Sequence, residues 1–133
     1  MRTTALIEKT TEGRYSIFTP DLVSTIVGAG ATVAEAKEDF ENALHEVEQA
    51  YAEDGVELPT ELQGVKFEYK YDVPSVFNEF DFINVTRFAK FIGINASLLR
   101  QYKTQGTYIS EAQAKKIERA LHSVGKKLSA ISL

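Results

Sequence analysis

The sequence predicts an α+β protein, in which a small β-sheet carrying one helix is followed by an all-α region. Three observations lead to this prediction. Residues 65–71 alternate between apolar and polar side chains, as in a strand with one buried face. Residues 33–51 carry apolar side chains at steps of three and four, as in an amphipathic helix. Around Gly93 two shorter stripes of this kind meet, as in two helices joined by a tight turn.

The chain begins with three short runs of β-prone residues, at 5–7, 15–18 and 25–27. Between the first two runs lies a polar stretch that ends in glycine, which indicates a hairpin. We expect the Gly-Ala-Gly sequence at 28–30 to close the third strand. With the helix and the alternating segment added, the first part of the chain reads β-β-β-α-β.

The helix of this first part has clear start and stop signals. Thr32 and Glu35 have the spacing of a capping box, in which each side chain accepts a free backbone N–H. Asp54 and Gly55 supply the stop. The apolar stripe between these signals consists of Val33, Ala36, Phe40, Ala43, Leu44, Val47 and Tyr51.

The C-terminal part reads as three helices. Asn84 and Asn95 are good N-caps for the first two helices, and Gly93 lies where a turn between them requires a positive φ. Ser110 begins a capping box for the third helix. The expected inner residues are Phe88, Ala89, Ile92, Ile94, Leu98, Leu99 and Tyr102, and the third helix has Ile117, Leu121, Val124, Leu128 and Ile131 on one side.

Charge is distributed unevenly along the 133 residues, whose formal net charge is −4. Up to Asp81 there are six basic and seventeen acidic residues, a net charge of −11. The remainder has nine basic and two acidic residues, a net charge of +7. A basic surface attracts phosphates and an acidic one repels them, so the two parts are expected to have different partners.

Nothing in the sequence demands catalytic chemistry. The carboxylates of Glu8, Asp21, Asp39 and Glu68 have no spacing that requires them to meet, and His45 has no neighbouring metal ligand. There is no cysteine, no phosphate-binding glycine loop and no nucleophile elbow. We therefore predict a protein that is not an enzyme, with no catalytic residue, no cofactor and no metal site.

The second of the three C-terminal helices has the composition of a DNA recognition helix. Its outward positions are small, polar or basic, which allows close approach to the major groove and hydrogen bonds to base edges. The predicted DNA-binding residues are Asn95, Ala96, Ser97, Arg100, Gln101 and Lys103. The alternative is a helical hairpin that binds only protein.

The chain also resembles a known protein family. The segments "YSIFTPDLVSTIVGAGATVAEAKEDFENAL" and "INVTRFAKFIGINASLLRQYKTQGTYISEAQAKKIERALHSVGKKL" are similar to those of HicB-type antitoxins of bacterial toxin–antitoxin systems. The resemblance implies a partial ribonuclease-H-like fold that binds and masks HicA, a small ribonuclease toxin. It also implies a helix-turn-helix domain that represses its own operon, usually as a dimer. One departure is that Val23-Ser24-Thr25 follows Pro-Asp-Leu, where many relatives have a Pro-Gly turn.

These observations divide the chain into an acidic toxin-binding domain at 1–72, a connector at 73–82 and a helix-turn-helix domain at 83–133. The expected partners are a HicA-like toxin, operator duplex DNA and a second copy of the chain, with Asp21 and Leu22 chosen as toxin contacts. No apolar stretch is long enough for a membrane span and no secretory signal is visible, so a cytoplasmic protein is expected. Two alternatives remain: a free-standing transcriptional regulator whose first domain senses a ligand, and an active nuclease that uses strand carboxylates.

Overall fold

The computed structural model describes residues 2–10, 12–104 and 110–133. The chain forms two compact units, Met1–Ser75 and Val76–Leu133, and the boundary between them falls within helix α2 (Val73–Glu79). The described residues contain a four-stranded mixed sheet and five α-helices, which confirms the α+β class. None of the helices in these ranges is long and apolar enough to cross a membrane.

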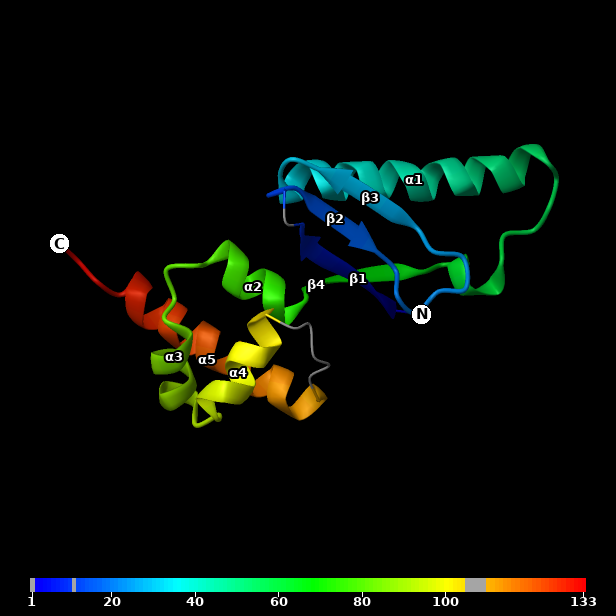
Figure 1. Ribbon diagram of the computed structural model, residues 1–133. Coiled ribbons are helices and arrows are strands. Elements are labelled where there is room, and N and C mark those ends of the chain that lie inside the picture. The colour runs from blue at the N-terminus through cyan, green and yellow to red at the C-terminus, as the bar shows by residue number, and fades with distance from the viewer. Residues whose placement is uncertain (1, 11, 105–109) are drawn as a thin grey trace. The chain divides into compact units, whose positions relative to one another are not determined.

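The first unit is built on a sheet with the strand order β3-β2-β1-β4 (Figure 1). Its strands are β1 (Arg2–Lys9), β2 (Tyr15–Phe18), β3 (Val27–Gly30) and β4 (Lys66–Tyr71). The first three strands pair antiparallel in succession, whereas β4 runs parallel to β1. The predicted hairpin is confirmed, because the Thr10 N–H donates to the Arg14 carbonyl at 2.7 Å and Gly13 has a φ of 79°.

Helix α1 (Val33–Glu53) covers one face of this sheet (Figure 1). Its N-cap is confirmed, because Thr32 Oγ1 accepts the Glu35 N–H at 3.1 Å. Glu35 Oε2 reaches back as expected, but accepts the N–H of Ala31, one residue before the N-cap, at 2.8 Å. The fully buried Phe40 points from α1 to the sheet, where the Phe67 ring meets it edge-on at 5.0 Å. The predicted stripe of α1 therefore forms one side of the core.

The third strand differs from its prediction. Instead of ending before the Gly-Ala-Gly sequence, β3 runs through it. Gly28 pairs with Ile17 in the register and lies under the helix. A Cβ atom on Gly28 would be 2.6 Å from Phe40 Cα and 2.7 Å from the Ala36 carbonyl oxygen. Glycine is therefore needed here because the helix backbone approaches the strand closely, and not because the chain turns.

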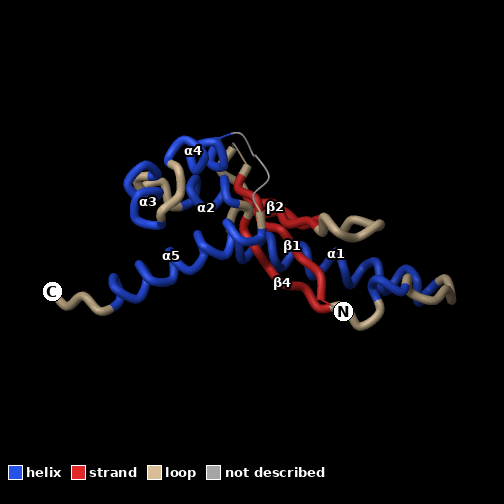
Figure 2. The backbone as a smooth tube through the Cα atoms, turned by 90° about the horizontal axis from the view of Figure 1, so that it is seen from below, coloured by secondary structure: helices blue, strands red, loops and turns tan. Residues whose placement is uncertain are grey.

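The second unit is made of helices joined by short loops in its described part (Figure 2). After α2 come α3 (Val85–Ile92), α4 (Ala96–Thr104) and α5 (Glu111–Ser129). The three predicted N-caps are confirmed, with Asn84, Asn95 and Ser110 each accepting the N–H three residues ahead at 3.0, 3.2 and 3.2 Å.

The turn between α3 and α4 ends α3 with a Schellman motif. Gly93 has a φ of 72°, its N–H donates to the Lys90 carbonyl, and the Ile94 N–H donates to the Ala89 carbonyl at 3.0 Å. Ala89 is fully buried, as a close crossing of helices requires. The positive φ predicted for Gly93 is confirmed.

The connector expected at 73–82 begins with helix α2, and its Phe77 is fully buried with its ring 5.8 Å from that of Phe88. One detail of the second unit differs from expectation. Helix α5 ends at Ser129, so Ile131 lies beyond it instead of on its apolar side. Near this end Leu128 is 59% exposed and Ile131 is 60% exposed. These two residues do not contribute to the core of the unit.

Candidate functional site

The start of α4 presents a polar face above an apolar one. Leu99 and Tyr102 are buried, while Ser97, Arg100 and Gln101 are exposed. Of the other predicted DNA contacts, Asn95 is exposed, Ala96 is half-buried, and the side chain of Lys103 lies outside the described residues. Asn95 Oδ1 accepts the Leu98 N–H, so this side chain also fixes the start of the helix. The structure thus places the exposed members of the set together.

The Arg100 side chain forms hydrogen bonds with residues of both α3 and α4. One guanidinium nitrogen donates to Thr86 Oγ1 in α3 at 2.8 Å, and the other donates to Ser97 Oγ in α4 at 3.3 Å. Two hydroxyl acceptors on different helices restrict the long side chain to few conformations. Thr86 was not among the sequence-predicted residues, although its place in the first turn of α3 was a usable signal.

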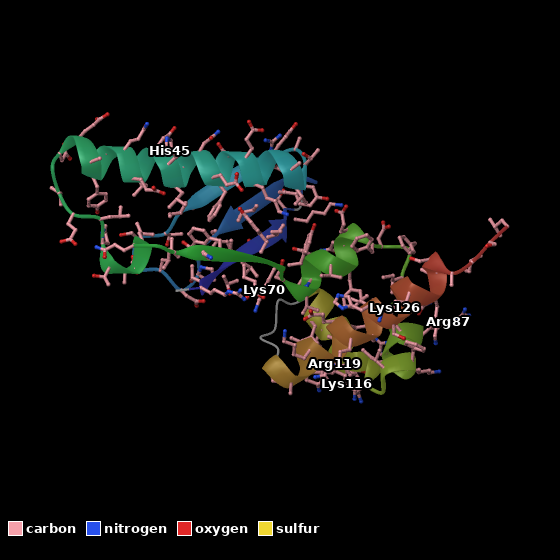
Figure 3. All side chains as sticks on the ribbon, turned by 180° about the vertical axis from the view of Figure 1, so that it is seen from behind. His45, Lys70, Arg87, Lys116, Arg119 and Lys126 are labelled. Carbon is pink, nitrogen blue, oxygen red and sulfur yellow. The ribbon has the colours of Figure 1, made fainter. Side chains whose placement is uncertain are left out.

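Helices α3 and α5 of this unit also carry basic residues. Lys116 Nζ, from α5, donates to the Gly93 carbonyl oxygen at 3.3 Å and so places a cation at the end of α3. Figure 3 labels Arg87 on α3 and Lys116, Arg119 and Lys126 on α5. The sequence of this unit has nine basic and four acidic residues, a net charge of +5.

Chemically, this face is rich in hydrogen-bond donors. A guanidinium group can donate two parallel hydrogen bonds to a planar acceptor such as a guanine edge or a phosphate. The Gln101 carboxamide can both donate and accept, which suits an adenine edge. Together with the net positive charge of its unit, the face is suited to a negatively charged partner that offers planar acceptors.

The predicted toxin contacts lie in the loop between β2 and β3. Asp21 is exposed, but Leu22 is only 7% exposed and belongs to the hydrophobic core. The Leu22 side chain therefore presents little surface in the free chain. Val23 beside it is 93% exposed, although the sequence did not lead us to choose it as a toxin contact. The unit that carries this loop has six basic and fifteen acidic residues, a net charge of −9.

Glu8 and His45, which were also considered from the sequence, lie on β1 and α1. Glu8 is half-buried on β1, where partial burial, and secondarily the charge of Asp72, raises the pKa of its carboxyl group. His45 is exposed on α1 (Figure 3). Among the residues that the structure describes, no three His, Asp or Glu side chains are placed to hold one metal ion.

No protein-family model, no curated protein and no solved structure matches the chain.

Proposed function

We propose that this protein is a HicB-type antitoxin with two binding units. Residues 76–133 bind operator duplex DNA as a helix-turn-helix and repress the protein's own operon. Residues 1–75, as a partial ribonuclease-H-like domain, bind and mask a HicA-like ribonuclease toxin by covering it, without chemistry of their own. The protein acts in the cytoplasm as a dimer and needs no cofactor.

The observation that carries the DNA-binding proposal is the exposed face of α4. Ser97, Arg100 and Gln101 lie side by side in the sequence positions expected for groove contacts, and Arg100 is already held by Thr86. The +5 charge of this unit supports attraction to DNA. The −9 charge of the other unit supports a basic partner, because a ribonuclease must present positive charge to hold its RNA.

The DNA part is tested on the promoter region upstream of the operon. We expect Gln101→Ala to cost roughly 1–3 kcal/mol of binding free energy on the operator and little on random DNA, because it removes a base contact. Lys103→Ala is expected to weaken both and to lower the salt slope by about one, because it removes a phosphate contact. Footprinting and titration at several salt concentrations measure these effects. Absence of protection by the protein, free or with its toxin, contradicts the assignment.

The antitoxin part is tested with the polypeptide encoded by the adjacent reading frame. We expect this polypeptide to be small and basic, to co-purify with the full chain and to cleave RNA only when the chain is absent. An adjacent product that neither binds the chain nor has its ribonuclease activity inhibited by it contradicts this part of the proposal.

A further inference from the structure

The loop at 19–26, between β2 and β3, exposes the apolar side chain of Val23 to solvent. Leu22 and Ile26 point into the core with exposed fractions of 7% and 4%. Val23 is 93% exposed, and Asp21 beside Leu22 is exposed as well. The loop contains no residue with a positive φ. Its buried and exposed positions therefore anchor it at two points and leave one valine at its surface.

Three hydrogen bonds hold the loop in this shape. At its base, the buried Thr19 Oγ1 accepts the Ile26 N–H at 2.9 Å. At its outer part, the Glu61 carboxylate accepts two backbone donors, the Val23 N–H at 3.1 Å and the Ser24 N–H at 3.2 Å. Both bonds are exposed, so their main effect is to hold the two backbone N–H groups in one direction and not to add stability. The backbone on both sides of the Val23 side chain is thereby fixed.

The clamp is itself attached to the core. Glu61 belongs to the short helical turn η1 (Thr60–Leu62), which runs beside the loop in Figure 1. Leu62, the next residue, is 3% exposed within the hydrophobic core. A single exposed apolar residue is common on protein surfaces. Here, however, a charged side chain 38 residues away in sequence keeps the exposed residue in place. Such preorganisation lowers the entropy that a partner must remove on binding.

The charge around the loop limits the kind of partner. Asp21 and Glu61 are acidic, and the unit to which they belong has a net charge of −9. Nucleic acids and anionic lipid surfaces carry negative charge and are repelled by such a surface. A basic protein with a small apolar pocket is attracted by the charge and accepts the valine.

We propose that this clamped loop docks the first unit onto a basic protein, with Val23 as the apolar anchor and Glu61 as its positioning residue. The inference rests on the proposed function, since it assigns the contact surface for the toxin. It differs from the sequence-based choice, because Leu22 supports the loop from inside and Val23 makes the contact.

The anchor is tested with the full chain and the product of the adjacent reading frame, by calorimetric titration. We expect Val23→Arg to weaken binding at least about tenfold, because it removes the apolar contact and adds charge that repels a basic partner. Val56→Arg is the matched control, since Val56 is a second valine of the same unit, 55% exposed and outside its strands and helices. The control is expected to keep the wild-type affinity within about twofold.

The clamp is tested with Glu61→Gln, in which an amide NH₂ replaces one of the two acceptor oxygens. Glu48→Gln, at an exposed position of α1, removes the same charge and is the control. We expect faster hydrogen exchange of the Val23 and Ser24 amides and weaker binding for Glu61→Gln alone. In a double-mutant cycle with Val23→Ala, the loss caused by Glu61→Gln is expected to shrink, because the clamp acts through the anchor.

The outcomes separate this inference from the proposed function. If the wild-type chain does not bind the adjacent product, the antitoxin proposal fails and the docking loop fails with it. If the wild type binds but Val23→Arg binds as tightly as Val56→Arg, only the docking loop is wrong. The wild-type chain and Val23→Arg are also compared for binding to RNA and to anionic vesicles. A difference between the two proteins in either assay would overturn the assignment of a protein partner.

Discussion

The Arg100 guanidinium lies between two hydroxyl groups that belong to different helices. Thr86 Oγ1 in α3 and Ser97 Oγ in α4 both accept hydrogen bonds from it. Each bond is exposed, so neither adds much to the stability of the fold. Their effect is on the direction of the side chain, which is therefore ordered without a bound partner.

We expect Thr86→Val to weaken operator binding by about 1 kcal/mol, because the oxygen that holds Arg100 is removed while the shape of the side chain is kept. Thr86→Ser retains the hydroxyl group and is expected to bind as the wild type does. The measurement is titration of operator DNA with each variant, alone and combined with Arg100→Ala. An equal loss in the presence and absence of Arg100 would show that Thr86 does not act through it.

Glu8 and Asp72 form a second pair of coupled side chains, in the acidic unit. Partial burial, together with the charge of Asp72, raises the pKa of Glu8 above its ordinary value of 4.5. Asp72 Oδ1 is buried without a hydrogen-bond partner among the described residues. The folded chain therefore binds the Glu8 proton more tightly than the unfolded chain does. Its stability falls as the pH rises from the unfolded pKa of Glu8 through the folded one.

Glu8→Gln removes this titration and is expected to raise the melting temperature at pH 7. Below about pH 4 the wild-type carboxyl group is itself protonated, so the difference between the two proteins is expected to disappear. Thermal unfolding at both pH values measures the effect. Glu48→Gln, which removes a charge from an exposed position of α1, controls for the lower net charge. A gain that is the same at both pH values would contradict this explanation.

Strand β3 and helix α1 pack with their backbones in close approach. Gly28 lies below Phe40, and Gly30 lies below the first turn of the helix, where an added Cβ atom would be 2.6 Å from Glu35 Cβ. Helix α1 can bury Phe40 fully only because these strand positions have no side chain. Glycine thus weakens the strand locally, and the packing of the helix compensates for it.

Gly28→Ala is expected to destabilise the protein by about 1–3 kcal/mol or more, because the added methyl group meets helix backbone that cannot move aside. Gly125→Ala is the opposite case. Nothing lies within 4 Å of a Cβ atom at that position of α5, and alanine is expected to add roughly 0.5–1 kcal/mol through helix propensity. Denaturant unfolding compares the two. Equal changes in the free energy of unfolding would mean that the close backbone contact does not require glycine at position 28.

The chain combines two units of opposite charge, −9 and +5. The proposed DNA binding through one short helix offers few contacts, so we expect two copies to act on neighbouring half-sites. The end of the second unit carries exposed apolar residues, with Phe91 54% and Leu128 59% exposed. Lys127 Nζ lies 5.4 Å from the centre of the Phe91 ring, so α3 and α5 meet at this surface. These residues are suited to contact a second copy.

We expect Leu128→Arg to turn a dimer into a monomer and to reduce operator affinity, because two charged side chains would meet across the interface. Ser123→Arg adds the same charge at another exposed position of α5 and is the control. Sedimentation of the full-length proteins over a range of concentrations measures the association. A wild-type protein that sediments as a monomer at high concentration would exclude this surface as the dimer contact.

The elements of this fold could be predicted because their signals are local. Thr32 caps a residue three positions ahead, and the N-caps at Asn84, Asn95 and Ser110 act over the same distance. The exposed face of α4 could be predicted for the same reason, since helix periodicity alone separates Arg100 from Leu99. The burial of Phe77 in the connector was less predictable, because it depends on contact with Phe88 in another helix.

Composition and local pattern therefore established the α+β class, the order of the elements, the caps and the opposite charges of the two parts. Packing between distant segments established the rest. Position 28 requires glycine because α1 packs closely on its strand, and Leu22 is buried while Val23 is exposed because of how their loop closes over the core. The contacts of Arg100 with Thr86 and of Val23 with Glu61 span 14 and 38 residues. Periodicity and capping relate residues only a few positions apart, and contacts over such separations exist only once the elements have packed.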